Sequence, residues 1–282
     1  MTGAKHFFPC GCWFSSPLPH STGRSQPAVL EVPDDDMRIA TWNLESLKQL
    51  TPERDAAFRL AMARIDADVW VLTETWNDLP PLSDYQLVAQ SGDANDLKRW
   101  PNRCWVSIWG KSSLAANGQV IHGQADRMAC GWIKIPGQRD IVVVGTVLPW
   151  RSDTLWPGDV GFGAALACQA EECGAIRGRP DTCDFVLAGD FNQSLPHRAY
   201  YGSKKGENAL NDAFQRHDLV CLTAGNDPIT DEPRIDHICV GRSSLKSSRI
   251  PHVGAWAIPS INDKPITDHA GVFAELDLFN FL

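Results

Sequence analysis

The stretch that most strongly indicates the fold spans residues 185–192 and reads Phe185-Val186-Leu187-Ala188-Gly189-Asp190-Phe191-Asn192. Its apolar part predicts a strand over 184–189, and the polar residues Asp190 and Asn192 follow at once. Residues 68–73 repeat the pattern: a nearly continuous apolar run predicts a strand buried on both faces, and Glu74 ends it. Side chains at strand ends lie on one rim of a sheet, on rigid supports. The chain therefore has candidate functional residues at a sheet rim.

Polar residues also occur at the ends of other predicted strands, or within them. They are Asn43, Asp236, His237, Asp268 and His269. With Asp190, Asn192 and Glu74 they offer four carboxylates, two amides and two imidazoles that could converge. Oxygen-rich clusters without cysteine suit hard cations such as Mg²⁺ or Mn²⁺. The sequence therefore predicts a site for a divalent metal.

The remaining chain alternates predicted strands with helices. Further strands are predicted at 37–43, 85–89, 104–109, 130–135, 140–148, 235–240, 254–258 and 270–277. One helix begins at Thr51-Pro52, where Thr51 is the expected N-cap and Pro52 the first helical residue. Two more helices are predicted near 160–176 and 208–217. This order predicts an α/β layered sandwich in which helices cover mixed sheets.

Residues 1–36 differ from the rest of the chain. They are rich in Pro, Ser and Gly, they end in Pro33-Asp34-Asp35-Asp36, and they show no helix or strand period. We therefore expect a disordered or loosely tethered leader followed by one domain over residues 37–282. Met37 opens the first strand, so one hypothesis takes Met37 as the natural start.

The composition limits the classes of function. The 282 residues include 26 Lys+Arg and 34 Asp+Glu, a net charge of −8, which disfavours a general nucleic-acid coat protein. An enzyme that brings positive charge as a bound metal is compatible with this balance. There is no apolar run of membrane-spanning length and no secretory signal. The nine cysteines follow no zinc spacing. We expect reduced thiols, a cytoplasmic location, no membrane partner and a monomer, although the sequence does not reveal the oligomeric state.

Five short motifs occur in a fixed order, each at or beside a strand end. They are Thr41-Trp42-Asn43, Leu72-Thr73-Glu74, Gly189-Asp190-Phe191-Asn192, Arg234-Ile235-Asp236 and Thr267-Asp268-His269. Over residues 37–282 this order resembles the endonuclease/exonuclease/phosphatase, or DNase I-like, superfamily. The resemblance implies a four-layer α/β/β/α sandwich, two packed mixed sheets flanked by helices. It also implies metal-dependent hydrolysis of a phosphoester at the rim shared by the sheets.

The resemblance also implies a metal-binding group. Glu74 would hold the divalent metal, Mg²⁺ or Mn²⁺. Asn43 would lie beside it, either as a ligand or as a partner of a ligand. Asp268 would support the metal or the neighbouring imidazole.

Other residues would act on the phosphate and the water. Asp190 would orient or deprotonate the attacking water, and Asn192 would bind the phosphate. His269, oriented by Asp236, would stabilise the negative charge of the transition state. An Asp–His pair suits this task because the carboxylate fixes the tautomer and favours imidazolium. His237 follows Asp236 directly, so strand alternation turns it to the opposite face, and we expect a structural histidine there.

One position departs from the family pattern. Where a His or Tyr is expected at the end of strand 140–148, this chain has Val147, which can neither donate a proton nor bind phosphate. Arg151 could supply charge stabilisation, Trp150 could stack on a base or sugar, and Thr146 is a weaker candidate. This departure leaves the leaving-group step in doubt.

The substrate is the least determined property. Arg99, Trp100 and Arg103 mix cations with an aromatic in a predicted loop, which suits a nucleic-acid backbone, although a plain solvated loop explains it equally well. The leading hypothesis is a nuclease acting on DNA or RNA. The alternatives are a phosphomonoesterase or a lipid or inositol phosphodiesterase, and then a non-catalytic binding domain, which Val147 supports slightly. The partner is thus nucleic acid or a small phosphodiester.

Overall fold

The computed structural model describes residues 36–46, 48–77, 79, 82–92, 102–119, 121, 124–135, 139–178, 183–196, 201–226, 233–245 and 251–277. The first strand begins at Asp36, one residue before the predicted Met37. The rest of the expected leader lies outside these ranges, so its disorder stays a prediction. Within the described ranges, no helix is both long enough and apolar enough to cross a membrane.

The first sheet has six strands in the order β11-β14-β1-β2-β4-β3. Their bounds are β1 (Asp36–Asn43), β2 (Val69–Trp76), β3 (Tyr85–Gln90), β4 (Arg103–Lys111), β11 (His252–Trp256) and β14 (Gly271–Asp277). β1 and β2 are parallel, whereas the other neighbours are antiparallel. The sheet is therefore mixed, as predicted.

The second sheet has the order β5-β6-β7-β8-β10-β9. Its strands are β5 (Ala115–Gln119), β6 (Met128–Lys134), β7 (Asp140–Val147), β8 (Cys183–Asp190), β9 (Leu219–Cys221) and β10 (Asp236–Gly241). Here β7 and β8 form the parallel pair. β12 (Ser260–Ile261) and β13 (Lys264–Pro265) form a separate two-stranded hairpin, and a 3-10 turn, η2 (Arg242–Ser244), follows β10.

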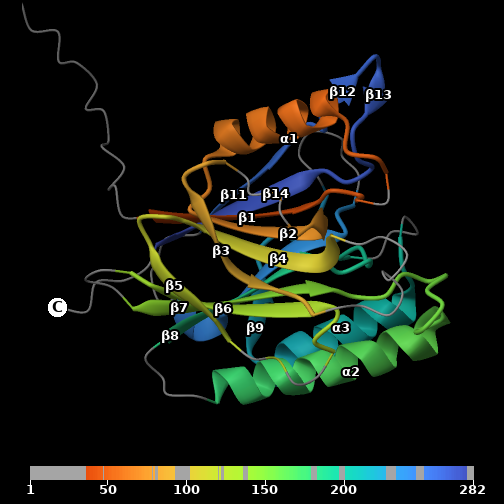
Figure 1. The fold of residues 1–282 in the computed structure, drawn as a ribbon. Helices are drawn as coiled ribbons and strands as arrows, with labels where there is room; N and C mark the ends of the chain where they lie inside the picture. The colour runs from red at the N-terminus through yellow and green to blue at the C-terminus, as the bar shows by residue number, and fades with distance from the viewer. Residues whose placement is uncertain are drawn as a thin grey trace, which may run out of the picture. The chain divides into compact units, whose positions relative to one another are not determined.

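Helices cover the outer faces of both sheets. Helix α1 (Pro52–Ile65) packs on the first sheet, and α2 (Gly158–Arg177) and α3 (Lys204–Arg216) pack on the second (Figure 1). One apolar core lies between the sheets, and two more lie beneath the helices. The predicted four-layer α/β/β/α sandwich is confirmed.

Capping residues explain where two helices begin. Thr51 accepts a hydrogen bond from Arg54 N of α1 at 3.3 Å, as its N-cap position predicts. Helix α3 begins at Lys204, earlier than the predicted 208. Ser203 caps it by accepting a hydrogen bond from Gly206 N at 2.9 Å. The spacing of apolar residues predicts a helix only from 208, because the first turn of α3 is polar.

The observed strands differ from the predictions at Glu74 and at β5. Glu74 does not end its strand, because β2 continues to Trp76, and Glu74 itself has a positive φ of 43°. Strand β5 was not predicted, because Ala115-Ala116-Asn117-Gly118-Gln119 has no apolar alternation. It is an edge strand whose residues are exposed or half-buried, so backbone pairing with β6 defines it.

Candidate active site

Asp190 and Asp236 face each other across two strands of the second sheet. Asp190 ends β8, Asp236 begins β10, and the two are direct partners in the antiparallel ladder. The next pair is hydrogen-bonded, since Phe191 N donates to Ile235 O at 2.9 Å. Because the two kinds of pair alternate, the two aspartates form a non-hydrogen-bonded pair, whose side chains lie closest. Both are buried, so their like charges need a compensating cation or proton.

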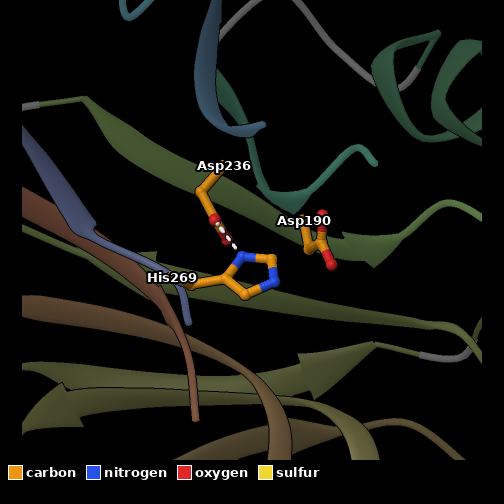
Figure 2. Close-up of side chains that lie close together, drawn as sticks. All are labelled: Asp190, Asp236 and His269. Atoms are coloured by element: carbon orange, nitrogen blue, oxygen red, sulfur yellow. Dashed lines mark hydrogen bonds and ion pairs between the residues drawn. The ribbon is translucent and has the colours of Figure 1, made fainter. Parts of the chain in front are cut away.

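His269 is one such cation, and it comes from the loop before β14. Its Nδ1 donates to Asp236 Oδ2 at 2.6 Å, and Figure 2 shows the ring between the two carboxylates. Two hydrogen bonds fix the backbone at this point. Trp42 Nε1 donates to the carbonyl of His269 at 2.9 Å, and His269 N donates to Thr267 Oγ1 at 3.3 Å. The backbone of His269 is therefore held from both the first sheet and its own loop.

The electrostatics of the site keep His269 protonated. Burial alone would lower its pKa, but the charges of Asp236 and Asp190 outweigh burial and raise the pKa of His269 to about 10. The ring is then an imidazolium at neutral pH, with one N–H on Asp236. Its Nε2 lies 3.7 Å from Asp268 Oδ1, and the Asp268 side chain is 70% exposed. The Nε2–H therefore points to the accessible side of the site.

Asp190 is held by three N–H donors. The backbone N of Asn192 donates to Oδ1 at 2.8 Å, and the amides of Asn192 and Asn43 donate to Oδ2 at 2.9 and 3.0 Å. Burial raises the pKa of Asp190 to about 7, the charges of Asp236 and Glu74 add to the rise, and His269 opposes it. A carboxylate with that pKa is suited to accept a proton near neutral pH.

The amide of Asn192 is already fully engaged. Its Nδ2 donates to Asp190 Oδ2 and also to Leu148 O, both at 2.9 Å, and an amide has only two such hydrogens. Asn192 adopts a φ of 48°, which asparagine tolerates better than most residues. In this arrangement Asn192 orients Asp190, and the expected contact with phosphate would have to replace one of these two bonds.

The first sheet contributes Asn43 and Glu74. The Nδ2 of Asn43 bridges the two sheets, since it donates to Glu74 Oε1 at 3.1 Å as well as to Asp190. Burial raises the pKa of Glu74, and the hydrogen bond from Asn43 opposes the rise. Glu45, which is not among the predicted site residues, donates its N–H to Asn43 Oδ1 at 2.9 Å, and its charge also raises the pKa of Glu74. In the sequence, the feature that points to Glu45 is its position two residues after Asn43.

The donor set fits a hard divalent cation. A carboxylate oxygen of Asp190, one of Asp236 and a ring nitrogen of His269 all lie within 4.8 Å of one another. Because both nitrogens of a protonated ring carry hydrogens, the carboxylates are the groups that offer ligand atoms. Asp236 Oδ1 is buried and has no hydrogen-bond partner among the described residues. Glu74 and Asn43 add oxygen atoms from the neighbouring sheet, and oxygen ligands are those that Mg²⁺ and Mn²⁺ prefer. The exposed Asp268 carboxylate is a further candidate on the open side.

Comparison with known sequences decides the family. The sequence profile of the Endonuclease/Exonuclease/phosphatase family matches residues 40–269. The chain belongs to this family. No curated protein sequence matches it significantly.

Solved structures of the same architecture share little sequence with this family member. The AP endonuclease LMAP from Leishmania major has 15% identity and a TM-score of 0.63, covering 86% of this chain and 88% of its own. TDP2 from D. rerio, complexed with single-strand DNA product, has 14% identity and a TM-score of 0.61, covering 86% and 99%. The endonuclease domain of TRAS1, a telomere-specific non-LTR retrotransposon, has 14% identity and a TM-score of 0.56, covering 86% and 99%. At these identities the likeness establishes the fold alone.

Val147 lies beside the sheet rim that carries Asp190 in this family member. It is the parallel neighbour of Asp190 across β7 and β8, and its side chain is fully buried in the core between the sheets. Thr146 is buried too, with its hydroxyl bonded to Gln169. These two positions therefore present no free proton donor to a leaving group.

The loop after β7 is fixed by a buried ion pair. Arg127 Nη2 lies 2.8 Å from Asp153 Oδ2, and both side chains are only 1% exposed. The guanidinium also lies over the rings of Trp105 and Trp150, at 4.7 and 5.4 Å from their centroids. Trp150 is half-buried against this cluster, whereas Arg151 is exposed. The loop that carries both predicted substrate residues is thus anchored to the sheets.

The other predicted substrate residues are less defined. Arg103 begins β4 as the partner of Trp76, and burial lowers its pKa. Arg99 and Trp100 lie outside the described residues. Their roles stay predictions.

His237 is a packed residue, as strand alternation predicted. It is fully buried, and its Nδ1 and Nε2 lie 3.2 Å from Thr223 Oγ1 and 3.0 Å from Gln193 O. Its ring also packs edge-on against Phe191, with centroids 5.4 Å apart. Both ring nitrogens therefore have partners away from the site.

Proposed function

We propose that this chain hydrolyses phosphodiester bonds of nucleic acid with the help of a divalent cation, Mg²⁺ or Mn²⁺. The observation that carries the proposal is the His269–Asp236 pair beside Asp190, with their ligand atoms within 4.8 Å of one another. Membership of the family supports the same chemistry. Phosphoester hydrolysis needs an aligned water, a proton acceptor and neutralisation of the phosphoryl charge, and this group can supply each.

Asp190 is the proposed proton acceptor. Its carboxylate is fixed by three donors, two from Asn192 and one from Asn43, so it keeps one orientation toward the attacking water. Because its pKa is about 7, it accepts a proton near neutral pH more readily than an ordinary aspartate does.

His269 is the proposed electrostatic partner of the phosphate. Its imidazolium keeps one N–H on Asp236 and directs the other to the open side, where it can donate to a phosphoryl oxygen. A donor placed where negative charge develops typically contributes about 10²–10³ in rate.

Glu74 is the residue we propose to hold the cation, with Asn43 and Asp268 as further candidates. Bound there, a divalent cation supplies neutralisation of the phosphoryl charge and lowers the pKa of water. The net charge of −8 is then no obstacle to a polyanionic substrate, since phosphate meets a local positive charge.

The proposal can be tested with plasmid, single-stranded DNA, RNA and bis-p-nitrophenyl phosphate, each with Mg²⁺, Mn²⁺ or EDTA. We expect cleavage of nucleic acid that EDTA and Asp190→Asn both abolish. Asp212→Asn is the matched control, because Asp212 is exposed on α3. Cleavage of bis-p-nitrophenyl phosphate alone would indicate that the substrate is a small phosphodiester and not nucleic acid. Cleavage of none of them would contradict the proposal.

A further inference from the structure

Two cysteines oppose each other at the edge of the second sheet. Cys221 of β9 and Cys239 of β10 are direct partners in the antiparallel ladder. The next pair is hydrogen-bonded, since Leu222 N donates to Ile238 O at 2.9 Å. By alternation the cysteines form a non-hydrogen-bonded pair, with Cα atoms about 4.5 Å apart and side chains on the same face. That separation is within the range that a disulfide spans.

The two thiols differ in their surroundings. Cys221 is half-buried and lines a surface cavity of about 560 Å³ between α3, β9 and η2. Its Sγ lies 3.9 Å from Thr223 Oγ1. Cys239 is fully buried behind it. A reagent in the cavity therefore reaches Cys221 first. Cys239 is the thiol that lies next to Cys221 once Cys221 has reacted.

The acidity of the two groups agrees with this order. A hydrogen bond from the Cys239 thiol holds the pKa of Cys221 well below its ordinary value, although burial opposes the shift. Burial, together with the nearby Cys221, holds the pKa of Cys239 well above its ordinary value. A half-buried thiol whose ionised form is favoured, beside a thiol whose ionised form is disfavoured, matches the environment of redox-reactive cysteines.

We propose that Cys221 and Cys239 are an oxidisable thiol pair that a peroxide converts to a cross-strand disulfide. The Cys221 thiolate attacks one peroxide oxygen, an S–O bond forms, the O–O bond breaks, and water leaves after protonation. The Cys239 sulfur then attacks the Cys221 sulfenic acid, the S–S bond forms, and the S–O bond breaks. The departing hydroxide takes the Cys239 proton as a second water. Two thiols are oxidised by two electrons while one hydrogen peroxide is reduced to two waters.

The other described cysteines provide internal comparisons. Burial raises the pKa of Cys104 and that of Cys173 to about 12, so these thiols should react slowly with peroxide. Cys168 is exposed on helix α2 and does not belong to a strand pair. Its oxidation therefore measures how readily peroxide reacts with an exposed thiol. The disulfide would fasten the edge strand β9 to β10, the strand that also carries Asp236.

Peptide mapping of the full chain tests the proposal. The reduced protein is treated with limiting hydrogen peroxide, remaining thiols are alkylated, and the digest is analysed by mass spectrometry without reduction. We expect a peptide cross-linked through Cys221 and Cys239, lighter by two hydrogens and reversed by dithiothreitol. In Cys239→Ser, dimedone should trap a sulfenic acid at Cys221, whereas Cys168→Ser should leave the cross-link unchanged.

The wild-type map alone is decisive, so it does not depend on whether a variant folds. Alkylation of both Cys221 and Cys239 under conditions that oxidise Cys168 would overturn the proposal. A cross-link that joins either residue to a different cysteine would overturn it as well.

Discussion

Replacing Asp236 by asparagine removes the charge that faces His269 while keeping the volume of the side chain. In the native site the 2.6 Å contact from Nδ1 to Oδ2 joins the two groups, and the pKa of His269 is about 10. Burial opposes that shift, and Asp190 is the other main carboxylate that supports it. Without the Asp236 charge, we expect the pKa of His269 to fall toward its ordinary value of 6.5 or below.

The size of the effect on hydrolysis follows from that fall. At pH 8 a group with a pKa of about 10 is almost fully protonated, whereas one with a pKa of about 6.5 is protonated in about one molecule in thirty. The loss of imidazolium alone therefore costs about thirtyfold. Loss of the tautomer that Asp236 fixes adds to this cost. Asparagine in place of the aspartate of a Ser-His-Asp triad lowers kcat about 10⁴-fold. We expect kcat/KM at pH 8 to fall by between about thirtyfold and 10⁴-fold.

Two assays separate the cause from the consequence. NMR of ¹⁵N-histidine-labelled protein in EDTA follows the His269 ring from pH 5 to 11, and cleavage of an oligonucleotide in Mg²⁺ gives kcat/KM. Glu275→Gln is the matched control, because His252 Nδ1 and Glu275 Oε2 form a similar pair at 2.8 Å in which His252 is 64% exposed. That control should leave both readouts unchanged. A His269 that still titrates near 10 in Asp236→Asn, or hydrolysis within tenfold of wild type, would show that the Asp236 charge does not control His269.

Three further outcomes are expected. Because the folded state raises the pKa of His269 from 6.5 to about 10, its contribution to stability is present below pH 6.5 and lost as pH rises toward 10. Denaturant unfolding in EDTA should show this loss in wild type, and His269→Gln should lack it. Because the pKa of Asp190 is raised to about 7, its ionised form is disfavoured in the folded state. The stability of wild type in EDTA should therefore fall as pH rises from about 4 to 7, and Asp190→Asn, which abolishes hydrolysis, should lack this contribution; an identical pH dependence in the variant would contradict this. Arg127→Met leaves the Asp153 charge buried and unpaired, so the free energy of unfolding should fall by about 3–5 kcal/mol. Adding Asp153→Asn should recover part of that loss.

The layered architecture was predictable because it depends on local patterns. Apolar runs such as Phe185–Ala188 mark buried strands, and polar residues directly after them mark the rim. Strand alternation also separated Asp236 from His237 correctly, since the period of two sends neighbours to opposite faces. Edge strand β5 carries no such pattern, because backbone pairing with β6 forms it.

The finer geometry of the site depends on contacts between distant segments. The register that sets Asp190 opposite Asp236 joins strands far apart in sequence, so no local signal predicts it. The same holds for the two hydrogen bonds of the Asn192 amide, because one of them goes to the carbonyl of Leu148 in the loop that follows β7. The Arg127–Asp153 pair likewise appears only once the chain is folded.

We propose that the buried cluster of Glu74, Asp190, Asp236 and His269 is a cation-dependent phosphodiesterase centre. A Mg²⁺ titration of oligonucleotide cleavage by wild type and Glu74→Gln tests it most directly. We expect saturable dependence on Mg²⁺ in wild type, no cleavage in EDTA, and a variant that needs about 10–100 times more Mg²⁺. Cleavage that persists in EDTA, or an identical Mg²⁺ dependence in Glu74→Gln, would contradict it.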